Sequence, residues 1–261
     1  MRQVTFKDIH KVGHIVHETQ QLKHIHYPEM LSRYNSNFIE YKTWVAVEEF
    51  QQDLQYLREF HMKNDQKHVK FYFPADEEIP DQIKDVLTKY QFEIEKLELY
   101  TLEPNRFPPV EDHPDISVHQ VTEENLEDFL SLQYQQDIPF GTNFAEQKIA
   151  LYKSFFEDPI IVQLLAYYKG IPAGSVHLIL SDATVEIDDF SVKADYQRKG
   201  IGTRLQKYVM EHFSDKTIIL VAEGSDTPRE MYQKQNYQCV GFRYEATKVY
   251  KSVKTPALTL F

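Results

Sequence analysis

Residues 185–213 constrain the fold of this chain more than any other stretch. They read VEIDDFSVKADYQRKGIGTRLQKYVMEHF, in which a strand-like segment runs into a short loop and then into an amphipathic helix. The apolar side chains of that helix recur at intervals of three or four residues, at Ile201, Leu205, Tyr208, Val209 and Phe213. Glycine lets a backbone approach a ligand closely, and the first N–H groups of a helix carry the positive end of its dipole. Residues 197–203 are therefore predicted to hold a phosphate group.

Three kinds of phosphate-binding loop can be compared with residues 197–203. A Walker loop needs Gly-Lys-Ser/Thr four residues after an earlier glycine, and the sequence contains no such string. A dinucleotide fingerprint needs a third glycine three residues after the second, but Leu205 stands there. The third kind is Gln/Arg-x-x-Gly-x-Gly/Ala, which Gln197, Gly200 and Gly202 satisfy.

The rest of the chain divides at residues 103–115, which hold four prolines and show no periodicity. We expect a first lobe over residues 1–102, a linker over 103–115 and a second lobe over 116–261. In the first lobe, the pattern predicts mostly helix over 4–31, helices over 50–60 and 80–90, and strands over 69–73 and 93–102. In the second lobe it predicts strands at 116–121, 160–168, 174–180, 185–192, 217–222 and 239–249, and helices from 122, at 145–156, from 201 and at 227–235.

The element order predicted for the second lobe is β-α-α-β-β-β-α-β-α-β, and with it the sequence resembles a known family. The loop pattern above and the pattern Tyr-x-x-x-x-Tyr/Phe, present as Tyr232 and Tyr237, are those of the GCN5-related N-acetyltransferases. The resemblance covers nearly the whole second lobe. It implies an α/β (α+β) fold with a mixed, mostly antiparallel sheet flanked by helices, whose fourth and fifth strands splay apart to admit acyl-CoA. Asn236 replaces the glycine common before the last aromatic residue, but asparagine also tolerates left-handed geometry.

The resemblance implies acetyl-CoA as the co-substrate and assigns its contacts. The N–H groups of the loop and the side chains of Arg198 and Lys199 would hold the pyrophosphate, and strand backbone would pair with the pantetheine amides. Ser225 stands where the family often has an asparagine seven residues before the helix tyrosine. The cofactor-binding residues expected are Phe190, Ser191, Val192, Gln197, Arg198, Lys199, Gly200, Ile201, Gly202, Thr203 and Ser225.

Catalytic residues are expected on the fourth strand and the last helix of the second lobe. Tyr232 matches the family tyrosine that lies near the CoA sulfur and acts as general acid; the alternative is a buried aromatic residue on an amphipathic helix. Glu186 and Asp188 share one face of a strand, and neighbouring carboxylates raise each other's pKa, which suits a general base. We rank Glu186 first, since some family members carry a catalytic glutamate at this place; alternatively both acids only attract a cation. Asp189 is expected on the opposite face, with a structural role.

The acceptor is expected between the strand acids and the loop near residues 134–143. Tyr134, Asp137 and Phe140 are the candidate wall residues of this substrate site. Aromatic side chains next to carboxylates suit a small-molecule amine or a peptide N-terminus, and the sequence leaves both open.

Composition limits the partners. With 29 basic and 40 acidic residues the formal net charge is −11, which argues against nucleic acid and is compatible with a cationic amine, although acidity also serves solubility alone. No apolar run approaches a membrane span and the N-terminus has no apolar signal core, so we expect no membrane partner. The single cysteine, Cys239, excludes an internal disulfide and fits a reducing cytoplasm. The oligomeric state stays open.

The first lobe carries His10, His14, His17, His24 and His26 within the helix expected over residues 4–31. His10 and His14 could share a helical face, but no His-Glu-x-x-His pattern and no acidic partner accompany them. We expect solvent-facing histidines and no metal.

The two lobes resemble each other weakly, which favours a tandem pair with a degenerate first copy; an unrelated α/β lobe is the alternative. Placing Leu54 on Leu205 puts Glu49 and Gln51 at the positions of the two loop glycines. A glutamate there would repel phosphate, so the first lobe is expected not to bind CoA.

The sequence as a whole predicts an acyl-CoA-dependent N-acetyltransferase (EC 2.3.1.-) that moves an acetyl group directly from acetyl-CoA to a primary amine. The first alternative is a non-enzymatic acyl-CoA-binding sensor or scaffold. The second is an interaction protein built from an inactive pair, against which the two loop glycines argue.

Overall fold

The computed structural model describes residues 3–224 and 226–250. These residues form two compact units, neither of which is continuous in the sequence. Unit 1 takes the residues up to His10 together with Leu97–Phe242, and unit 2 takes Lys11–Lys96 and the described residues from Arg243 onward. None of the described helices is long and apolar enough to cross a bilayer.

Unit 1 is built on a mixed sheet of six strands in the order β5-β10-β9-β8-β7-β6. The strands are β5 (Glu93–Leu102), β6 (Ile116–Gln120), β7 (Ile161–Tyr168), β8 (Ile171–Leu180), β9 (Thr184–Val192) and β10 (Thr217–Glu223). The pair β9–β10 is parallel, and the other neighbours are antiparallel. The mixed, mostly antiparallel sheet expected from the sequence is confirmed.

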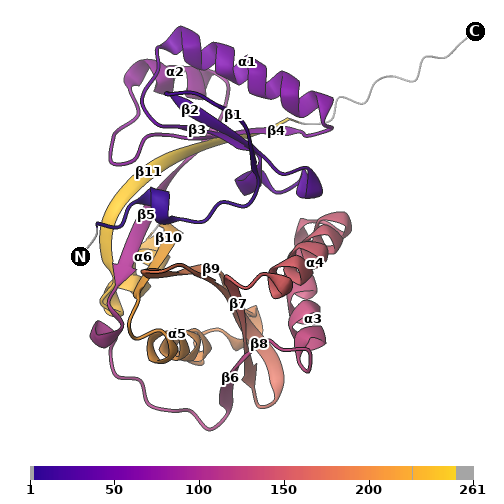
Figure 1. Ribbon diagram of the computed structural model, residues 1–261, viewed down its shortest axis with the longest axis vertical. Helices are drawn as coiled ribbons and strands as arrows, with labels where there is room; N and C mark the ends of the chain where they lie inside the picture. The colour runs from indigo at the N-terminus through magenta and orange to yellow at the C-terminus, as the bar shows by residue number, and fades with distance from the viewer. Residues whose placement is uncertain (1–2, 225, 251–261) are drawn as a thin grey trace, which may run out of the picture. The chain divides into compact units, whose positions relative to one another are not determined.

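Helices cover both faces of this sheet (Figure 1). The helices α3 (Leu126–Asp137) and α4 (Thr142–Glu157) pack on one face, where Leu165 of β7 joins their core. On the other face, Leu164 of the same strand packs in the core of α5 (Ile201–His212), with α6 (Asp226–Lys234) beside it. Since successive residues of a strand point to opposite faces, every strand of unit 1 has an α3/α4 face and an α5 face.

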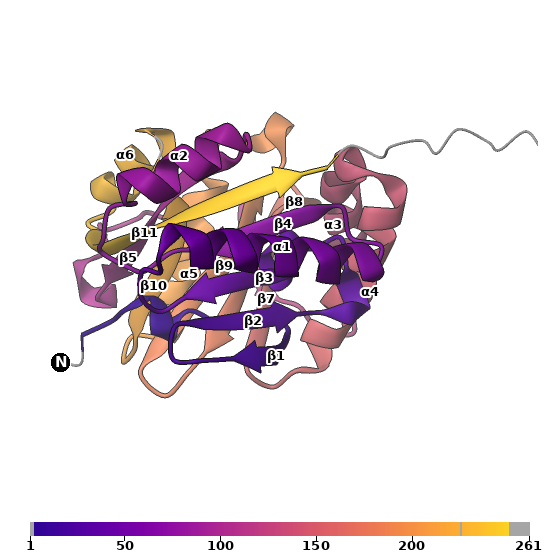
Figure 2. The same ribbon diagram turned by 90° about the horizontal axis from the view of Figure 1, so that it is seen from above.

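Unit 2 has a sheet in the order β1-β2-β3-β4-β11, covered on one face by two helices (Figure 2). The strands are β1 (His14–Glu18), β2 (Leu22–His26), β3 (Phe38–Tyr41), β4 (His68–Tyr72) and β11 (Gln238–Val249). The helices are α1 (Val47–Lys63) and α2 (Asp81–Lys89). Phe50 and Leu57 of α1 and Leu87 of α2 are completely buried with Val69 and Phe71 of β4.

The helix predicted over residues 4–31 is wrong. The structure has the hairpin β1–β2 there, preceded by the short 3-10 helix η1 (Phe6–Asp8). Gly13 adopts φ +127, and a Cβ at this position would lie 2.8 Å from Cγ2 of Ile25, so the chain bends where a helix would have to continue. The helix-like spacing of Ile9, Val12 and Ile15 does not reflect one buried face.

The histidines of unit 2 are also placed differently from the expectation. His24, His61 and His68 are completely buried and His26 nearly so, whereas His14 and His17 lie exposed on β1. His61 donates through Nδ1 to the carbonyl of His68 at 2.7 Å. Burial, followed by neighbouring imidazoles, lowers the pKa of His24 to about 3. Within the described residues, no group of three or more His, Cys, Asp or Glu side chains is arranged to hold a metal ion.

The two halves of the chain repeat one order of elements, β3-α1-β4-α2-β5 and β9-α5-β10-α6-β11, and β3–β4 is parallel like β9–β10. The last strand of each half, however, pairs in the other unit. Residues of β5 pair with Ile218–Glu223 of β10, and residues of β11 pair with His68–Tyr72 of β4. The compact units therefore do not end at residues 103–115.

Candidate active site

Strands β9 and β10 separate part-way along unit 1. Their register covers only Thr184, Val185 and Glu186 of β9, opposite Thr217, Ile218 and Ile219 of β10. Beyond this point β9 continues to Val192, while β10 continues to Glu223 along β5. In the described part of the chain the parallel ladder ends there, which confirms the splayed strands expected from the sequence. One backbone edge of β9 is left open to pair with another extended molecule.

A β-bulge interrupts β9 just after the separation. Asp188 is paired with His177 of β8 and Ser191 with Ser175, so two residues of β9 stand opposite one residue of β8. Asp189 lies in the bulge with φ +48, a left-handed conformation that is unusual for a residue other than glycine. The bulge turns the strand at the beginning of the open edge.

The loop after β9 ends at the N-terminus of α5, and its two glycines meet different requirements. Gly200 is the N-cap at φ +84, where a Cβ would also collide with the guanidinium of Arg204. Gly202 lies in the first turn, and a Cβ there would lie 3.1 Å from Cζ of Phe190 on β9. The N–H of Arg204 is bonded to the carbonyl of Gly200 at 3.2 Å, so the N–H groups of Ile201, Gly202 and Thr203 precede the helical ladder. The backbone geometry suits an anion.

Three cationic or polar side chains border this turn. Lys199 lies over the rings of Tyr168 and Tyr196, 4.9 and 5.0 Å from their centroids. Gln197 donates through Nε2 to the carbonyl of Val192 at 3.3 Å, which connects the loop to the open strand. Arg204, which no motif in the sequence indicates, donates to the carbonyls of Gly200 and Glu111, the latter at 2.8 Å. The sequence signal that could have indicated Arg204 is its position one helical turn after Gly200.

A cavity of about 550 Å³ lies next to the start of α5. Its walls are residues 107–110 of the linker, Thr203 of α5, and Glu230, Met231, Lys234 and Gln235 at the end of α6. Thr203 thus belongs both to the glycine turn and to this cavity, so a molecule with a phosphate and a larger organic group could occupy both. Ser225, the remaining predicted cofactor contact, lies outside the described residues.

The acids predicted as bases lie on the α3/α4 face of β9. Val185 and Ile187 are buried in the core beneath α5, and Glu186 and Asp188 therefore point the other way. Glu186 is 7% exposed, and its Oε2 accepts a hydrogen bond from the backbone N–H of His10 at 2.7 Å. Asp188 is half-buried. The two carboxylates share a face as expected, but their surroundings differ.

The expectation that Asp189 points to the opposite face is wrong. Its carboxylate lies 3.0 Å from Nζ of Lys148 and 2.9 Å from the hydroxyl of Tyr152, both on α4. It is therefore on the same face as Asp188, because the bulge interrupts the alternation of the strand. The alternation of side chains between the two faces of a strand breaks at a bulge, and this bulge is set by the pairing of β9 with β8.

Tyr232 lies on α6 in the core beneath α5, on the face of the sheet opposite to the acids. Its ring is 5.4 Å from that of Tyr100 and 5.3 Å from that of Tyr237. Burial raises the pKa of Tyr232, so its phenol is protonated at neutral pH. Asn236 adopts the left-handed φ of 66° expected from the sequence.

The three predicted wall residues of the acceptor site are placed in different surroundings. Phe140, in the short helix η5 (Ile138–Phe140) between α3 and α4, is 74% exposed and its ring is 5.8 Å from that of Phe144. Tyr134 is half-buried. Asp137 is only 9% exposed, with its Oδ2 3.1 Å from the hydroxyl of Tyr152.

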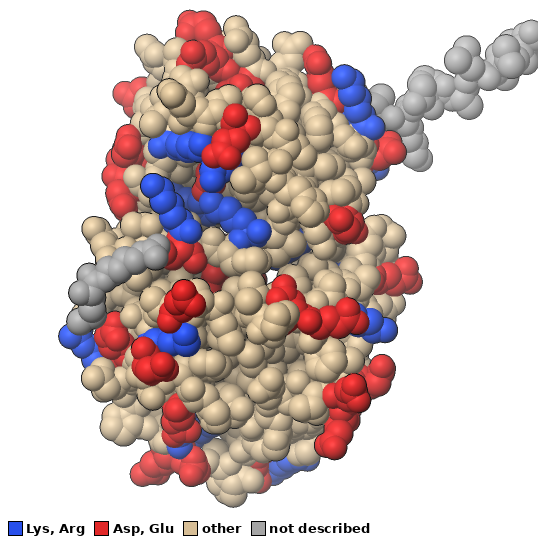
Figure 3. Space-filling view, in the orientation of Figure 1, with Lys and Arg blue, Asp and Glu red and all other residues tan. Residues whose placement is uncertain are grey.

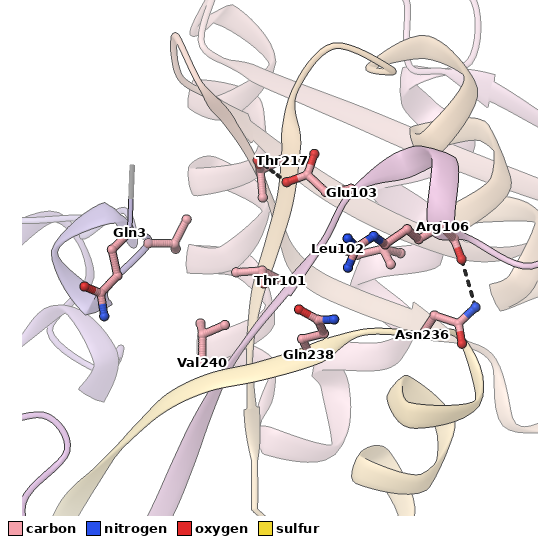
Figure 4. A pocket seen from close by; sticks show the side chains of 10 residues that line it. Gln3, Thr101, Leu102, Glu103, Arg106, Thr217, Asn236, Gln238 and Val240 are labelled. Carbon is pink, nitrogen blue, oxygen red and sulfur yellow. Dashed lines mark hydrogen bonds between the residues drawn. The ribbon is translucent and has the colours of Figure 1, made fainter. Parts of the chain in front are cut away.

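A second cavity, of about 540 Å³, lies at the other end of β10 (Figure 4). Thr217, the first residue of β10, donates to Glu103 at 2.9 Å on its wall, and Asn236 donates to the carbonyl of Arg106 at 2.8 Å. Because β9 and β10 are still paired at Thr217, this cavity is separate from the point where the strands open.

Surface charge does not gather in one region on the side of unit 1 that Figure 3 shows. On the face shown in Figure 3, acidic side chains are scattered with basic ones among them and do not merge into one patch. Acidic and basic side chains also pair directly in unit 1, as Nζ of Lys207 and Oδ1 of Asp112 do, 2.6 Å apart. The local acids of β9 are therefore the stronger indication of what the site attracts.

Residues 120–237 match the model of the acetyltransferase (GNAT) family, and this range contains the separated strands, the glycine turn and Tyr232. This part of the chain belongs to the GCN5-related N-acetyltransferase family. Residues 4–100 match a second model, described as a domain of unknown function (DUF5613).

Similar proteins extend the similarity to both halves of the chain. The uncharacterized N-acetyltransferase CgeE of Bacillus subtilis (strain 168) is 26% identical over 187 residues, which cover 68% of each chain. The solved structure of a functionally unknown conserved protein from Staphylococcus epidermidis ATCC 12228 is 32% identical with a TM-score of 0.87, over 95% of this chain and 99% of that one. The GCN5-related N-acetyltransferase from Sphaerobacter thermophilus has a TM-score of 0.62 at 11% identity, over 88% and 76% of the chains, which shows the fold alone.

Proposed function

We propose that this chain transfers an acetyl group from acetyl-CoA directly to a primary amine of a small molecule or peptide. The observation that carries the proposal is the opening between β9 and β10 with a glycine-capped helix at the end of β9. An open strand edge and an anion-binding turn in one continuous segment suit a long amide-containing molecule with a pyrophosphate.

The turn would hold the pyrophosphate. The N–H groups of Ile201, Gly202 and Thr203 precede the helical ladder, and the dipole of α5 favours negative charge there. Arg198 and Lys199 add two positive charges. The cavity between the linker and α6 begins at Thr203 and would take the nucleoside end. The open edge at Phe190, Ser191 and Val192 would pair with the pantetheine amides.

Tyr232 would act as general acid. As the carbon–sulfur bond of the thioester breaks, the sulfur needs a proton, and the raised pKa of Tyr232 keeps that proton available. The phenol lies on the α5 face and the carboxylates lie on the α3/α4 face. A thioester passing through the opening between the strands would meet the acid on one side and the amine on the other.

For the general base, the structure favours Asp188 over Glu186, which reverses the order suggested by the sequence. Glu186 is nearly buried and already accepts a hydrogen bond from His10. Asp188 is more accessible and lies one step closer to the open edge. It would take a proton from the ammonium form of the acceptor, directly or through water, so that the neutral amine can attack the thioester carbonyl.

The acceptor would lie on the α3/α4 face. The carboxylates there suit a positively charged amine, and the exposed ring of Phe140 in η5 suits an apolar group next to it. Asp137 is too deeply buried to contact it, so Phe140 and Tyr134 are the remaining wall residues.

Unit 2 would not bind acetyl-CoA in the same way. Counted from the helix start, Ala46 and Glu48 of α1 correspond to Gly200 and Gly202 of α5, three residues before the sequence-based register. Neither is glycine, and Glu49 caps the helix by accepting from the N–H of Ala46 at 3.2 Å. A carboxylate at the helix N-terminus would repel phosphate.

A thiol-release assay with acetyl-CoA over small amines, polyamines and peptides tests the proposal. We expect release above the hydrolysis background with at least one amine. Binding of CoA without thiol release from any amine would instead support the sensor or scaffold alternative, which the intact turn fits equally well.

A further inference from the structure

The bulge of β9 is connected to α3 and α4 by a chain of polar side chains that the proposed transfer does not use. At its centre is Asp189, whose left-handed backbone (φ +48) is disfavoured for a residue with a side chain. Such a conformation persists when its surroundings enforce it. The contacts of the Asp189 carboxylate are the part of these surroundings that side chains supply.

Two residues of α4 hold this carboxylate. Nζ of Lys148 lies 3.0 Å and the hydroxyl of Tyr152 lies 2.9 Å from the same oxygen, Oδ2. Lys148 also lies over the Tyr152 ring, 4.6 Å from its centroid, so the two side chains support each other. Nδ1 of His177 on β8 is 3.8 Å away, which adds a third group beside the carboxylate.

Tyr152 extends the chain to the acceptor side. Its hydroxyl is also 3.1 Å from Oδ2 of Asp137, the last residue of α3, immediately before η5. The single hydroxyl hydrogen of Tyr152 is therefore shared between two carboxyl groups. Burial raises the pKa of Asp137, whereas Lys148 and His177 overcome the effect of burial and lower the pKa of Asp189. The hydroxyl hydrogen of Tyr152 is drawn more strongly to Asp189, at 2.9 Å, than to Asp137, at 3.1 Å, and the hydroxyl links the end of α3 to the bulge.

We propose that Lys148, Tyr152 and Asp137 form a latch on Asp189, which holds the bulge of β9 in place and couples it to the acceptor segment η5. Asp189 is thus a positioning residue that keeps the open edge of β9 aligned, and its role in turnover rests on the proposed acetyl transfer. An acceptor that moves η5 would shift Asp137 and, through Tyr152, the strand that aligns the thioester.

The direct test is hydrogen–deuterium exchange on the full chain without any ligand, which does not depend on activity. Tyr152→Phe removes only the hydroxyl, and the ring can keep its contacts with Phe129 and His177. We expect exchange of the amides over residues 187–192 to speed up roughly tenfold or more. Lys148→Met, which removes the other bond to Asp189, should give the same regional effect.

Tyr167→Phe is the matched control, because Tyr167 of β7 donates to Asp128 at 2.8 Å in the same unit but away from the bulge. It should leave exchange at residues 187–192 unchanged. Equal exchange there in Tyr152→Phe, Tyr167→Phe and the unsubstituted protein would overturn the latch.

Kinetics separate this inference from the proposed function. Tyr152→Phe should lower kcat by roughly tenfold with little change in the Kd of CoA, because the turn that holds the pyrophosphate is intact. An inactive unsubstituted protein would contradict the acetyl transfer and leave the exchange result to decide the latch. An active protein whose kcat is unaffected by Tyr152→Phe would refute the positioning role.

Discussion

At the residue scale, Tyr232 carries the most specific chemical assignment. Tyr232→Phe should lower kcat by at least about tenfold, since general acid catalysis contributes at least that much, with little change in the KM for acetyl-CoA. Steady-state kinetics with an amine identified by the thiol-release assay measure both quantities.

Tyr237 offers the matched control for this substitution. Its ring packs against Tyr232, but its buried hydroxyl has no hydrogen-bond partner among the described residues. Tyr237→Phe should leave kcat unchanged. If the two variants lose activity to the same extent, the effect is one of packing and Tyr232 is not the acid.

At the element scale, the buried histidines between α1 and the sheet of unit 2 make its stability depend on pH. Burial, the largest cause, lowers the pKa of His24 and His68 to about 3 and that of His61 to about 4, against about 6.5 in an unfolded chain. The unfolded chain therefore binds more protons at acid pH. The contribution of these histidines to the free energy of unfolding is therefore fully present above pH 6.5. It declines as the pH falls towards their pKa values in the folded state.

We expect the free energy of unfolding of unit 2 to fall below pH 6.5 by up to about 1.4 kcal/mol per pH unit for each of these histidines. Trp44, the one tryptophan of the chain, packs in the core of unit 2 and reports its unfolding in urea. His24→Phe should make the free energy of unfolding fall less steeply with pH, because one of the three titrating histidines is removed. A free energy that stays constant from pH 7 to pH 5 would show that the buried histidines do not titrate on unfolding.

The sequence predicted the second lobe well because its elements carry strong local signals. The amphipathic spacing of Leu205 and Val209, the glycine turn and the alternating strands all act within a few residues. The hairpin β1–β2 was missed because apolar residues there happen to recur at helical intervals. The bulge at Asp189 depends on register with β8, so no segment of β9 alone indicates it. The role of Arg204 depends likewise on the linker carbonyl that it reaches.

At the scale of the whole molecule, the exchange of last strands sets where the chain can be divided. Leu99, Tyr100 and Leu102 of β5 are at most 2% exposed, and their strand pairs with β10 in unit 1. A cut within residues 103–115 would remove them from the second half and leave β10 with an unpaired edge. The pairing of β5 with β10 joins residues that are far apart in the sequence. The sequence therefore could not show that residues 103–115 do not separate the two compact units.

A truncated chain over residues 103–261 should therefore be less stable than one over residues 93–261, which keeps β5. Loss of a large buried side chain costs about 2–5 kcal/mol, so the difference should be clear in thermal unfolding. Both truncations lack residues 1–92 and differ only in residues 93–102, which makes them a matched pair. Equal melting temperatures would contradict the importance of β5 for unit 1.

The central claim, that the turn at the start of α5 holds the cofactor and its counterpart on α1 does not, is tested most directly by calorimetric titration with acetyl-CoA. We expect one molecule of acetyl-CoA bound per chain. Gly202→Val should raise the Kd at least about tenfold, because its side chain would enter the space next to Phe190. Glu48→Val, at the same helical position of α1, should leave the Kd unchanged. No binding at millimolar acetyl-CoA, or equal binding by the Gly202→Val variant, would contradict the account.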